Sequence, residues 1–223
     1  MEQRAAQIKK RIAAAAQRSG RQASDITLVA VTKTVTPEVA RQAFDLGLTN
    51  LGENRVQELK IKMQHIPEAR WHMIGRLQTN KVKDVVGRVC LIHSVDRWNL
   101  AEEINKRGKL LNIQVPVLLE INIAGEEQKA GFNPNDVNSF LDSAGQLEAI
   151  RICGFMTVAP IVEDAEQTRP VFRELRRLKE ELGKKPFYNA DLKHLSMGMT
   201  ADFEVAIEEG ATIVRIGSAL FQK

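Results

Sequence analysis

Short apolar runs alternate with amphipathic stretches along the whole chain. Eight runs have the composition of strands that are buried on both faces, as in a parallel sheet. These runs are TLVAV (27–31), NLG (50–52), RWHMIG (70–75), VCLIHS (89–94), VPVLLEIN (115–122), IRICGFM (150–156), LKHLSMG (192–198) and TIVRIG (212–217). Seven of them are followed by a segment with the spacing of an amphipathic helix. The pattern therefore predicts alternating strands and helices.

The boundaries of several helices can be read from the same pattern. An extra helix is expected over 3–19, where apolar residues recur at helical spacing at Ala5, Ile8, Ile12 and Ala15. Pro37 and Pro134 stand where a helix would begin, a position that tolerates proline. The segment 165–182 carries an apolar stripe made by Val171, Leu175, Leu178 and Leu182. Pro170 marks either a kink in that helix or its true start.

Alternating strands and helices predict parallel pairing and an α/β fold. Eight strands are the number in a (β/α)8 barrel, the TIM barrel, and we expect one such domain over residues 1–223. A doubly wound sheet is the alternative, but no GxGxxG sequence follows the first strand, which weakens a dinucleotide-binding interpretation. Only six residues follow Gly217, so the last helix is expected to be very short or missing. The extra N-terminal helix is then expected to cover part of the gap.

The composition is that of an ordinary globular protein. Of the 223 residues, 43% are hydrophobic and 27% are charged, and a chain of this length can bury a full core without disulfides or metals. The two cysteines, Cys90 and Cys153, argue against a secreted disulfide framework and for a reducing compartment. No stretch approaches the roughly 20 apolar residues of a transmembrane helix, and the N-terminus lacks the pattern of a signal peptide. We therefore expect a soluble cytoplasmic protein with no membrane partner.

The formal net charge of +4 fits either a nucleic-acid partner or an anionic small ligand. Basic residues are spread along the chain, often beside acids, and aromatic residues make up only 5%, so platforms for stacking bases are scarce. We therefore expect no nucleic-acid partner. The four histidines have no metal-ligand spacing, so no metal site is expected. The chain also holds no nucleophile elbow.

In a TIM barrel the active site lies where strands end and the following loops begin. Lys33 directly follows the run 27–31 and therefore lies at the barrel mouth. Burial there would favour the neutral amine, which can attack a carbonyl and form a Schiff base. The alternative is a lysine on the rim that pairs with an acid.

The loops after strands seven and eight commonly hold phosphate in such barrels. Here they are SMGMT (196–200) and RIGS (215–218). They offer two hydroxyls and two glycines that let backbone N–H groups approach an anion, namely Ser196, Ser218, Gly198 and Gly217. The segment 201–210 predicts a helix whose N-terminus faces the same place. Two ordinary turns are the alternative, since glycine and serine are common in turns.

Arg215 lies inside an otherwise apolar strand, where a charge needs a partner or a ligand. One interpretation is an ion pair with an acid across the barrel. The other is a contact with the ring nitrogen of a bound pyridine, which a permanently protonated guanidinium would keep unprotonated. Such a cofactor would be a weaker electron sink than one paired with an aspartate.

Six segments carry long and uncommon motifs, in an order that spans nearly the whole chain. They are LVAVTKT (28–34), LGENRVQE (51–58), WHMIGRLQTNK (71–81), KAG (129–131), HLSMGMTADFEVAI (194–207) and VRIGSALF (214–221). In these motifs the chain resembles the pyridoxal phosphate homeostasis proteins, single-domain relatives of the N-terminal barrel of alanine racemase. The resemblance implies a protein that binds pyridoxal 5′-phosphate (PLP).

The resemblance also implies roles for particular residues. Lys33 would carry PLP as a Schiff base, Arg215 would lie near the pyridine nitrogen, and Asn54 and Met156 would lie beside the ring. The phosphate would be surrounded by Ser196, Gly198, Gly217 and Ser218. The family motif near the mouth is matched by three residues to which we assign no task, His72, Asn80 and Lys81. Serine is frequent in the family at two positions where this chain keeps a hydroxyl, Thr32 and Thr200.

The implied function is PLP binding in vitamin B6 homeostasis, without significant turnover. The expected partners are PLP and, as candidate recipients, the apo forms of PLP enzymes, and the protein is expected to be a monomer. A racemase-like PLP enzyme is one alternative, but racemases add a β-rich domain with a catalytic tyrosine. No chain is left here to build that domain, and Tyr188 lies before strand seven. A Schiff-base aldolase is another, for which Glu53 is the clear candidate acid at the strand ends.

Overall fold

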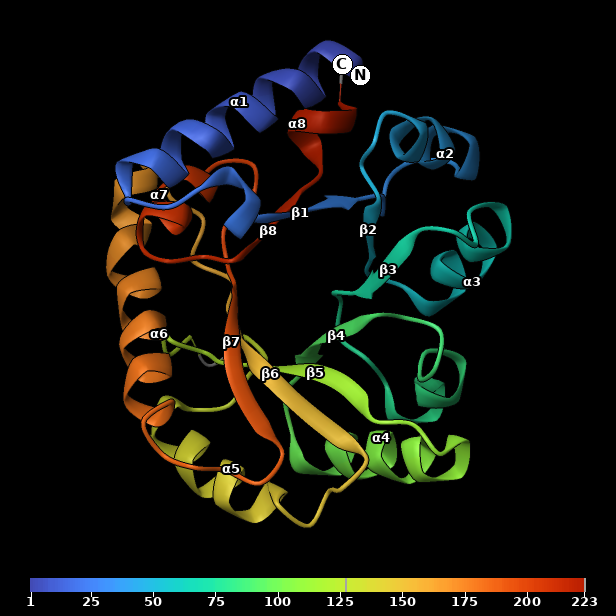
Figure 1. Cartoon of the computed structure of the whole chain (residues 1–223), viewed down its shortest axis with the longest axis vertical. Helices are drawn as coiled ribbons and strands as arrows, with labels where there is room; N and C mark the ends of the chain where they lie inside the picture. The colour runs from blue at the N-terminus through green and yellow to red at the C-terminus, as the bar shows by residue number, and fades with distance from the viewer. Residues whose placement is uncertain (127, 223) are drawn as a thin grey trace.

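The computed structural model describes residues 1–126 and 128–222, and its centre is a closed barrel of parallel strands (Figure 1). Each strand pairs with its neighbours in chain order, and β1 closes the barrel against β8. The strands are Thr27–Val31 (β1), Asn50–Glu53 (β2), Arg70–Met73 (β3), Leu91–Val95 (β4), Val115–Glu120 (β5), Ile150–Met156 (β6), Ala190–Ser196 (β7) and Ile213–Ile216 (β8). The predicted TIM barrel is confirmed, and the doubly wound sheet is excluded.

Helices surround the barrel on its outside (Figure 1). The α-helices are Glu2–Arg18 (α1), Pro37–Asp45 (α2), Val56–His65 (α3), Trp98–Leu111 (α4), Val137–Ala144 (α5), Arg169–Leu182 (α6), Phe203–Glu208 (α7) and Ser218–Phe221 (α8). Short 3-10 helices cover Ala23–Asp25 (η1), Thr79–Asp84 (η2), Pro134–Asp136 (η3) and Ala165–Thr168 (η4). Pro170 lies in the first turn of α6 and so marks its start. Pro134 opens η3 instead of an α-helix.

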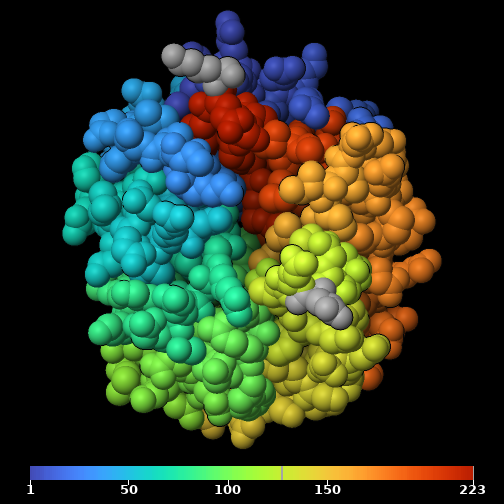
Figure 2. All heavy atoms as spheres, turned by 180° about the vertical axis from the view of Figure 1, so that it is seen from behind, coloured from blue at the N-terminus to red at the C-terminus, as the bar shows by residue number. Residues whose placement is uncertain are grey.

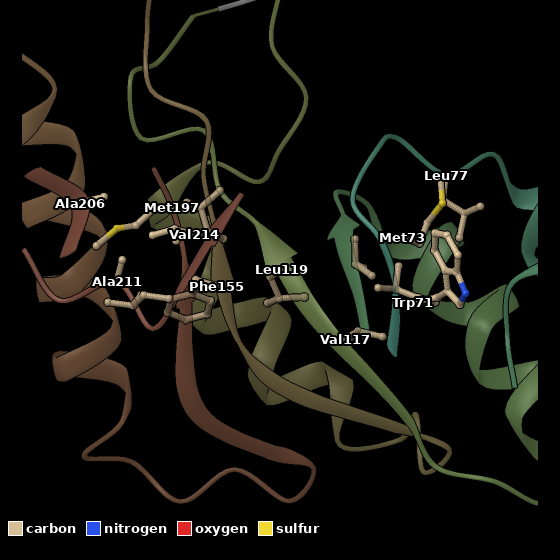
Figure 3. Close-up of a cluster of buried hydrophobic side chains, with 14 of the residues drawn as sticks. Trp71, Met73, Leu77, Val117, Leu119, Phe155, Met197, Ala206, Ala211 and Val214 are labelled. Carbon is tan, nitrogen blue, oxygen red and sulfur yellow. The ribbon is translucent and has the colours of Figure 1, made fainter. Parts of the chain in front are cut away.

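The core lies mainly between the barrel wall and the surrounding helices. Alternate strand residues point outward, and Figure 3 shows this layer around Trp71, Met73, Leu119 and Phe155, all of them buried. A smaller apolar cluster fills the inside of the barrel and consists of Val29, Leu91, Leu118, Met156 and Ile213. The interior is therefore only partly apolar, which leaves room for polar side chains.

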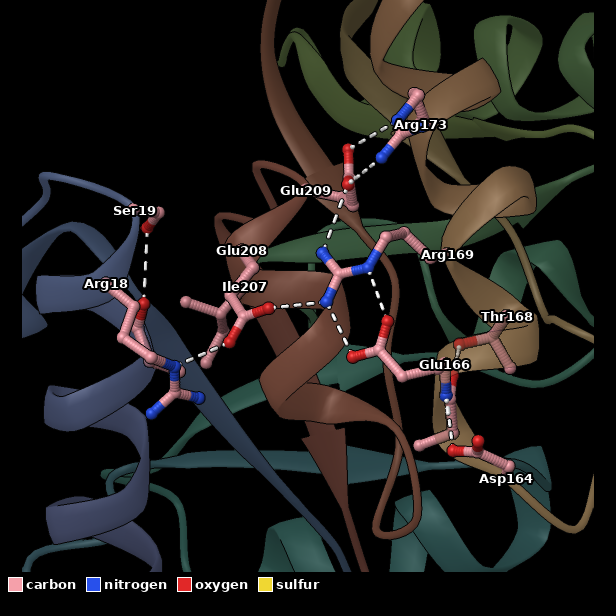
Figure 4. Close-up of polar contacts among 12 residues, drawn as sticks. Arg18, Ser19, Asp164, Glu166, Thr168, Arg169, Arg173, Ile207, Glu208 and Glu209 are labelled. Carbon is pink, nitrogen blue, oxygen red and sulfur yellow. Dashed lines mark hydrogen bonds and ion pairs between the residues drawn. The ribbon is translucent and has the colours of Figure 1, made fainter.

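The N-terminal helix covers the place where the last helix is short, as the sequence predicted. Helix α1 packs against α7 and α8 (Figure 1). Arg11 stacks on the ring of Phe203 at 4.7 Å and pairs with Glu204 at 2.6 Å. At the other end of α1, Arg18 pairs with Glu208, which also contacts Arg169 of α6 (Figure 4).

Within residues 1–126 and 128–222, no helix combines the length and the apolar character that crossing a membrane requires.

Candidate functional site

The face that carries the strand-to-helix loops is hollowed near its centre. Figure 2 shows this hollow between the blue and teal loops after β1 and β2, the yellow-green loop after β5 and the red end of the chain. One cavity on this face measures about 690 Å³ and is lined by the loops after β1 and β2, including Lys33, Thr34, Glu53, Asn54 and Glu58. The structure thus brings Lys33 and Asn54 to one cavity, as the strand-end rule predicted.

Lys33 is an exposed residue at the rim of this cavity, so of the two placements that the sequence left open, inside the mouth or out at the rim, the structure has the second. Val31, which ends β1, and Thr32 are buried, and the chain turns outward immediately after them. In the described part of the chain, no carboxylate lies within ion-pair distance of Lys33. The alternative of a rim lysine paired with an acid is therefore not what the structure shows.

A buried ion pair supports the loop that carries Lys33. The Lys62 ammonium of α3 donates to Glu53 Oε1 at 2.6 Å and to the Thr32 carbonyl at 2.8 Å. The side chains of Lys62 and Glu53 are fully buried. Since Thr32 immediately precedes Lys33, this contact fixes the peptide from which Lys33 projects.

The sequence did not single out Lys62. Its only signal is its place on the apolar face of a helix, three residues after Leu59 and four before Ile66, both of which are fully buried. A lysine at such a position needs a buried acid.

The Glu53 carboxylate is engaged by three hydrogen-bond donors. It accepts hydrogen bonds from the Thr32 hydroxyl at 2.6 Å, from Lys62 and from the Asn54 backbone N–H at 3.3 Å. A carboxylate held by three donors is poorly placed to shuttle protons. The one acid that favoured a Schiff-base aldolase therefore has a structural task.

The two loops expected to surround a phosphate lie side by side. The Arg215 N–H donates to the Gly198 carbonyl at 3.0 Å, and the Ala219 N–H donates to Thr200 Oγ1 at 3.4 Å. Gly198 has φ +89°, and a Cβ there would lie 2.5 Å from the Ala206 Cβ, so the turn requires glycine. Ser218 is exposed on the same face. Gly198, Gly217 and Ser218 are thus brought together.

Ser196 differs from these three residues, because its side chain is buried inside the barrel. Its hydroxyl accepts a hydrogen bond from Arg215 Nη1 at 2.6 Å and lies 2.9 Å from His93 Nδ1. The start of α7 is also occupied, since the Asp202 carboxylate accepts from the Met199 N–H at 2.6 Å. An anion between the loops would therefore meet Gly198, Gly217 and Ser218 more readily than Ser196 or the start of α7.

Arg215 projects into the barrel from β8 and is 5% exposed. Its Nη2 donates to the Thr157 carbonyl at 2.9 Å. Burial lowers the pKa of Arg215 to about 10, an effect that the carboxylates of Glu120 and Asp202 partly oppose, so the guanidinium stays charged at neutral pH. No acid in the described residues lies within ion-pair distance of it, so its direct partners are neutral oxygens.

Met156 and Glu120 lie on neighbouring strands at the same level of the barrel. Met156 belongs to the interior apolar cluster and is 2% exposed. Burial, followed by the nearby Asp96 carboxylate, raises the pKa of Glu120 to about 7. Glu120 also lines a small cavity of about 200 Å³ with Asn122 and Lys129. The sequence did not single out Glu120, although it ends the apolar stretch VPVLLE.

The motif WHMIGRLQTNK is divided between two places. His72 is buried inside the barrel, where its Nδ1 lies 2.9 Å from His93 Nε2. Asn80 and Lys81 lie in η2, and Asn80 lines a separate cavity of about 420 Å³ with Arg76 and Arg97. Among the residues that the structure describes, no cluster of histidine, cysteine and acidic side chains has the geometry of a metal site.

Comparisons with known proteins place this architecture in a family. The family model for the alanine racemase N-terminal domain matches residues 4–223. The pyridoxal phosphate homeostasis protein of Aquifex aeolicus is 48% identical over 221 residues, which cover 98% of this chain and 96% of that protein. The protein of the same name from Pseudomonas aeruginosa is 37% identical over 219 residues, 97% of this chain and 92% of that one.

Solved structures agree with this assignment. PipY of Synechococcus elongatus with PLP bound superposes with a TM-score of 0.83 at 34% identity, covering 96% of this chain and 99% of that one. An alanine racemase of Clostridium difficile matches with a TM-score of 0.74 at 18% identity over 88% of this chain and 55% of that one, which shows a shared fold alone. The chain belongs to the alanine racemase N-terminal domain family and, within it, to the pyridoxal phosphate homeostasis proteins.

Proposed function

We propose that this protein binds PLP covalently through Lys33 and acts in vitamin B6 homeostasis. The observation that carries the proposal is the placement of Lys33, an exposed amine at the rim of a cavity. The loop that carries it is held by the buried Lys62–Glu53 pair, because Lys62 also donates to the Thr32 carbonyl. The relative in Aquifex aeolicus is named for PLP homeostasis, and PipY has been solved with PLP bound.

The residues at the mouth fit the three functional groups of PLP. The Lys33 amine can condense with the aldehyde, forming a C=N bond and releasing one water. The charged Arg215 fits a pyridine nitrogen that carries no proton, because two positive groups would repel one another. Gly198, Gly217 and Ser218 offer an anion close backbone approach and a hydroxyl. Bound PLP supplies a conjugated ring that can withdraw electrons from an attached amine.

The acid–base groups near the mouth and the charge of Arg215 argue against rapid turnover. Proton transfer on both faces of a bound amino acid needs two positioned acid–base groups. Glu53 is held by three donors, and Tyr188 is 83% exposed in the loop before β7. Arg215 beside the ring nitrogen would leave PLP a poor electron sink. We therefore propose that the protein holds PLP rather than running a fast reaction with it.

A racemase-like activity is the second candidate, and Glu120 is the observation that favours it. A carboxyl whose pKa is raised to about 7 is suited to accept and return a proton near neutral pH. Glu120 also lines a cavity. It ends β5 and pairs there with Met156 of β6. An assay of proton exchange at Cα separates the two candidates.

The first experiment tests covalent binding. Wild-type protein mixed with PLP is expected to turn yellow and, after borohydride reduction, to gain the mass of one reduced adduct on Lys33. Lys33→Ala is expected to lose the adduct, and Lys83→Ala, which removes an exposed lysine of η2, is expected to keep it. A reducible adduct at wild-type occupancy in Lys33→Ala would show that another lysine is the anchor.

The second experiment tests turnover. Purified protein is incubated with L-alanine and PLP in deuterated water, and deuterium at Cα and the appearance of D-alanine are followed beside a PLP-only control. We expect both to stay close to the control. Exchange at the typical rate of an enzyme, about 1 per second or faster, and its loss in Glu120→Gln, would establish the racemase-like activity instead.

We further propose that the protein is a cytoplasmic monomer that passes PLP to apo enzymes. Its two cysteines are unpaired and half-buried, as suits a reducing compartment. Light scattering on the PLP-loaded protein tests the monomer. Transfer is tested by adding an apo PLP enzyme together with a scavenger of free PLP, and reactivation despite the scavenger is the expected result.

A further inference from the structure

A chain of hydrogen-bonding side chains crosses the inside of the barrel. It starts at Arg215 on β8, passes through Ser196 on β7, His93 on β4 and His72 on β3, and ends at Asn50 on β2. The four donor–acceptor distances, in that order, are 2.6, 2.9, 2.9 and 3.1 Å. Bulky aliphatic residues usually fill this part of a TIM barrel. Polar groups in their place need a reason, because a buried polar group is costly without partners.

The residues at the two ends of this hydrogen-bond chain determine the direction in which its hydrogen bonds run. A guanidinium can only donate, so Arg215 donates to the Ser196 oxygen, and Asn50 Oδ1 can only accept. Ser196 can then donate its own proton to His93 Nδ1. His93 donates from Nε2 to His72 Nδ1, and His72 donates from Nε2 to Asn50. Every donor and every acceptor between the two ends is used once.

This direction requires both imidazoles to be neutral, because each must accept at Nδ1 and donate at Nε2. Their surroundings agree with that requirement. Burial, together with the positive charge of Arg70, lowers the pKa of His72 to about 3. Burial also lowers the pKa of His93 well below its ordinary value, with His72 and Arg215 contributing. The two rings meet edge to face, with centroids 5.1 Å apart.

Building on the proposed function, we infer that His93 is a positioning residue that, through Ser196, holds Arg215 against the pyridine ring of bound PLP. His93 Nδ1 accepts the hydrogen bond of the Ser196 hydroxyl, so the lone pairs of the Ser196 oxygen are left for Arg215 Nη1. Arg215 Nη2 is fixed separately by the Thr157 carbonyl. With both terminal nitrogens held by the barrel wall, the guanidinium cannot rotate freely, and its charge stays at one place.

Asparagine and glutamine variants test the two hydrogen bonds of His93, to Ser196 and to His72, separately. An asparagine amide reaches about the position of imidazole Nδ1, and a glutamine amide reaches about the position of Nε2. His93→Asn therefore keeps a partner for Ser196 and loses His72, whereas His93→Gln keeps His72 and loses Ser196. His194→Gln is the matched control, since His194 lies half-buried on β7 beside Thr212 and outside the chain.

The experiment compares these variants and Ser196→Ala after loading with PLP. The readouts are the visible spectrum of bound PLP and its pH titration, the Kd for PLP and the urea unfolding midpoint without PLP. Ser196→Ala removes the charge-assisted hydrogen bond to Arg215, and His93→Gln leaves the Ser196 hydroxyl free to rotate away from Arg215. We therefore expect both variants to shift the spectral titration in the same direction and to raise Kd about tenfold or more. His93→Asn and His194→Gln are expected to stay near wild type in spectrum and Kd.

A purely structural role would lower the unfolding midpoint of both His93 variants alike and would leave the spectrum of the bound fraction unchanged. That result, or equal spectral shifts in His93→Asn and His93→Gln, would overturn the inference while leaving PLP binding intact. Absence of bound PLP in the wild type would overturn the proposed function, and this role with it. In ligand-free protein, ¹⁵N NMR is expected to show the Nε2–H tautomer for both His72 and His93, and an Nδ1–H tautomer would contradict the chain's direction.

Discussion

At the scale of single residues, the site depends on charges that the barrel keeps out of water. Lys62 and Glu53 are both fully buried and bonded to one another at 2.6 Å. Such a pair is weak evidence for stability as a whole, because removing two charges from water costs about as much as their attraction returns. Removing only one partner is a different matter, since the other is left buried and uncompensated.

Lys62→Met is therefore expected to lower the free energy of unfolding by about 3–5 kcal/mol. The double variant Lys62→Met with Glu53→Gln is expected to recover part of the loss, because no charge is then left buried. Urea denaturation of wild type, both single variants and the double variant completes the cycle. Additive losses would mean that the two residues act independently.

The buried histidines give a second prediction, in the pH dependence of stability. His72 has a pKa of about 3 in the folded protein and about 6.5 in the unfolded chain. Below pH 6.5 the unfolded chain takes up a proton that the folded protein excludes, so stability falls as the pH drops from 6.5 towards 3 and is constant in this respect above 6.5.

The expected loss from His72 is about 1.4 kcal/mol for each pH unit in that window. Urea unfolding at pH 7.5, 6, 5 and 4.5 measures it. In His72→Gln the slope is expected to be shallower by this amount, while His65→Gln, which changes an exposed histidine of α3, is expected to keep the wild-type slope. Equal slopes in all three proteins would show that His72 takes up its proton in the folded barrel as readily as in the unfolded chain.

At the scale of secondary-structure elements, the hydrophobic pattern predicted the fold well. The runs at 27–31 and 150–156 match β1 and β6 residue for residue, because continuous apolar strands in a parallel barrel leave a clear signal. The seventh run was placed two residues too late. Strand β7 begins at Ala190, and the chain turns at Gly198, whose φ of +89° is incompatible with a strand.

The candidate site was only partly predictable for a physical reason. Lys33, Gly198 and Gly217 follow strand ends, so a rule about strand ends finds them. Lys62 reaches the site from the inner face of a helix, and the link from His72 to His93 depends on how β3 and β4 pair. Contacts of that kind need three-dimensional register, which spacing along one chain does not contain.

Gly198 supplies a prediction at the level of its turn. Gly198→Ala is expected to cost about 1–3 kcal/mol, because the positive φ is strained for alanine and the new Cβ would lie 2.5 Å from the Ala206 Cβ. PLP affinity is expected to fall with it, since the turn shapes the proposed phosphate site. Gly145→Ala is the control, as a Cβ there meets nothing closer than 3.7 Å. Wild-type PLP affinity in Gly198→Ala would show that this turn does not shape the phosphate site.

At the scale of the whole molecule, the barrel is completed by segments far apart in sequence. Helix α1 comes before the first strand, yet it packs beside α7 and α8 near the end of the chain (Figure 1). Arg169 of α6 joins the same region, because it contacts Glu166, Glu208 and Glu209, and Glu208 pairs in turn with Arg18 of α1 (Figure 4). These contacts tie α1, α6 and α7 together.

Arg169→Met is accordingly expected to destabilise the protein by more than an exposed ion pair would suggest. A single surface pair contributes roughly 0–1 kcal/mol, but Arg169 is only 23% exposed at its side chain and bridges three carboxylates, which are left to repel one another when it is removed. We expect a loss of roughly 1–2 kcal/mol at low salt, measured by urea unfolding, and a smaller loss in 1 M NaCl, where the charges are screened. Arg177→Met is the matched control on the same helix, because Arg177 is 66% exposed and pairs with Glu174 at 3.8 Å. If the two variants lose the same stability at both salt concentrations, the network behaves as a set of independent surface pairs, and packing alone holds α1 against the end of the barrel.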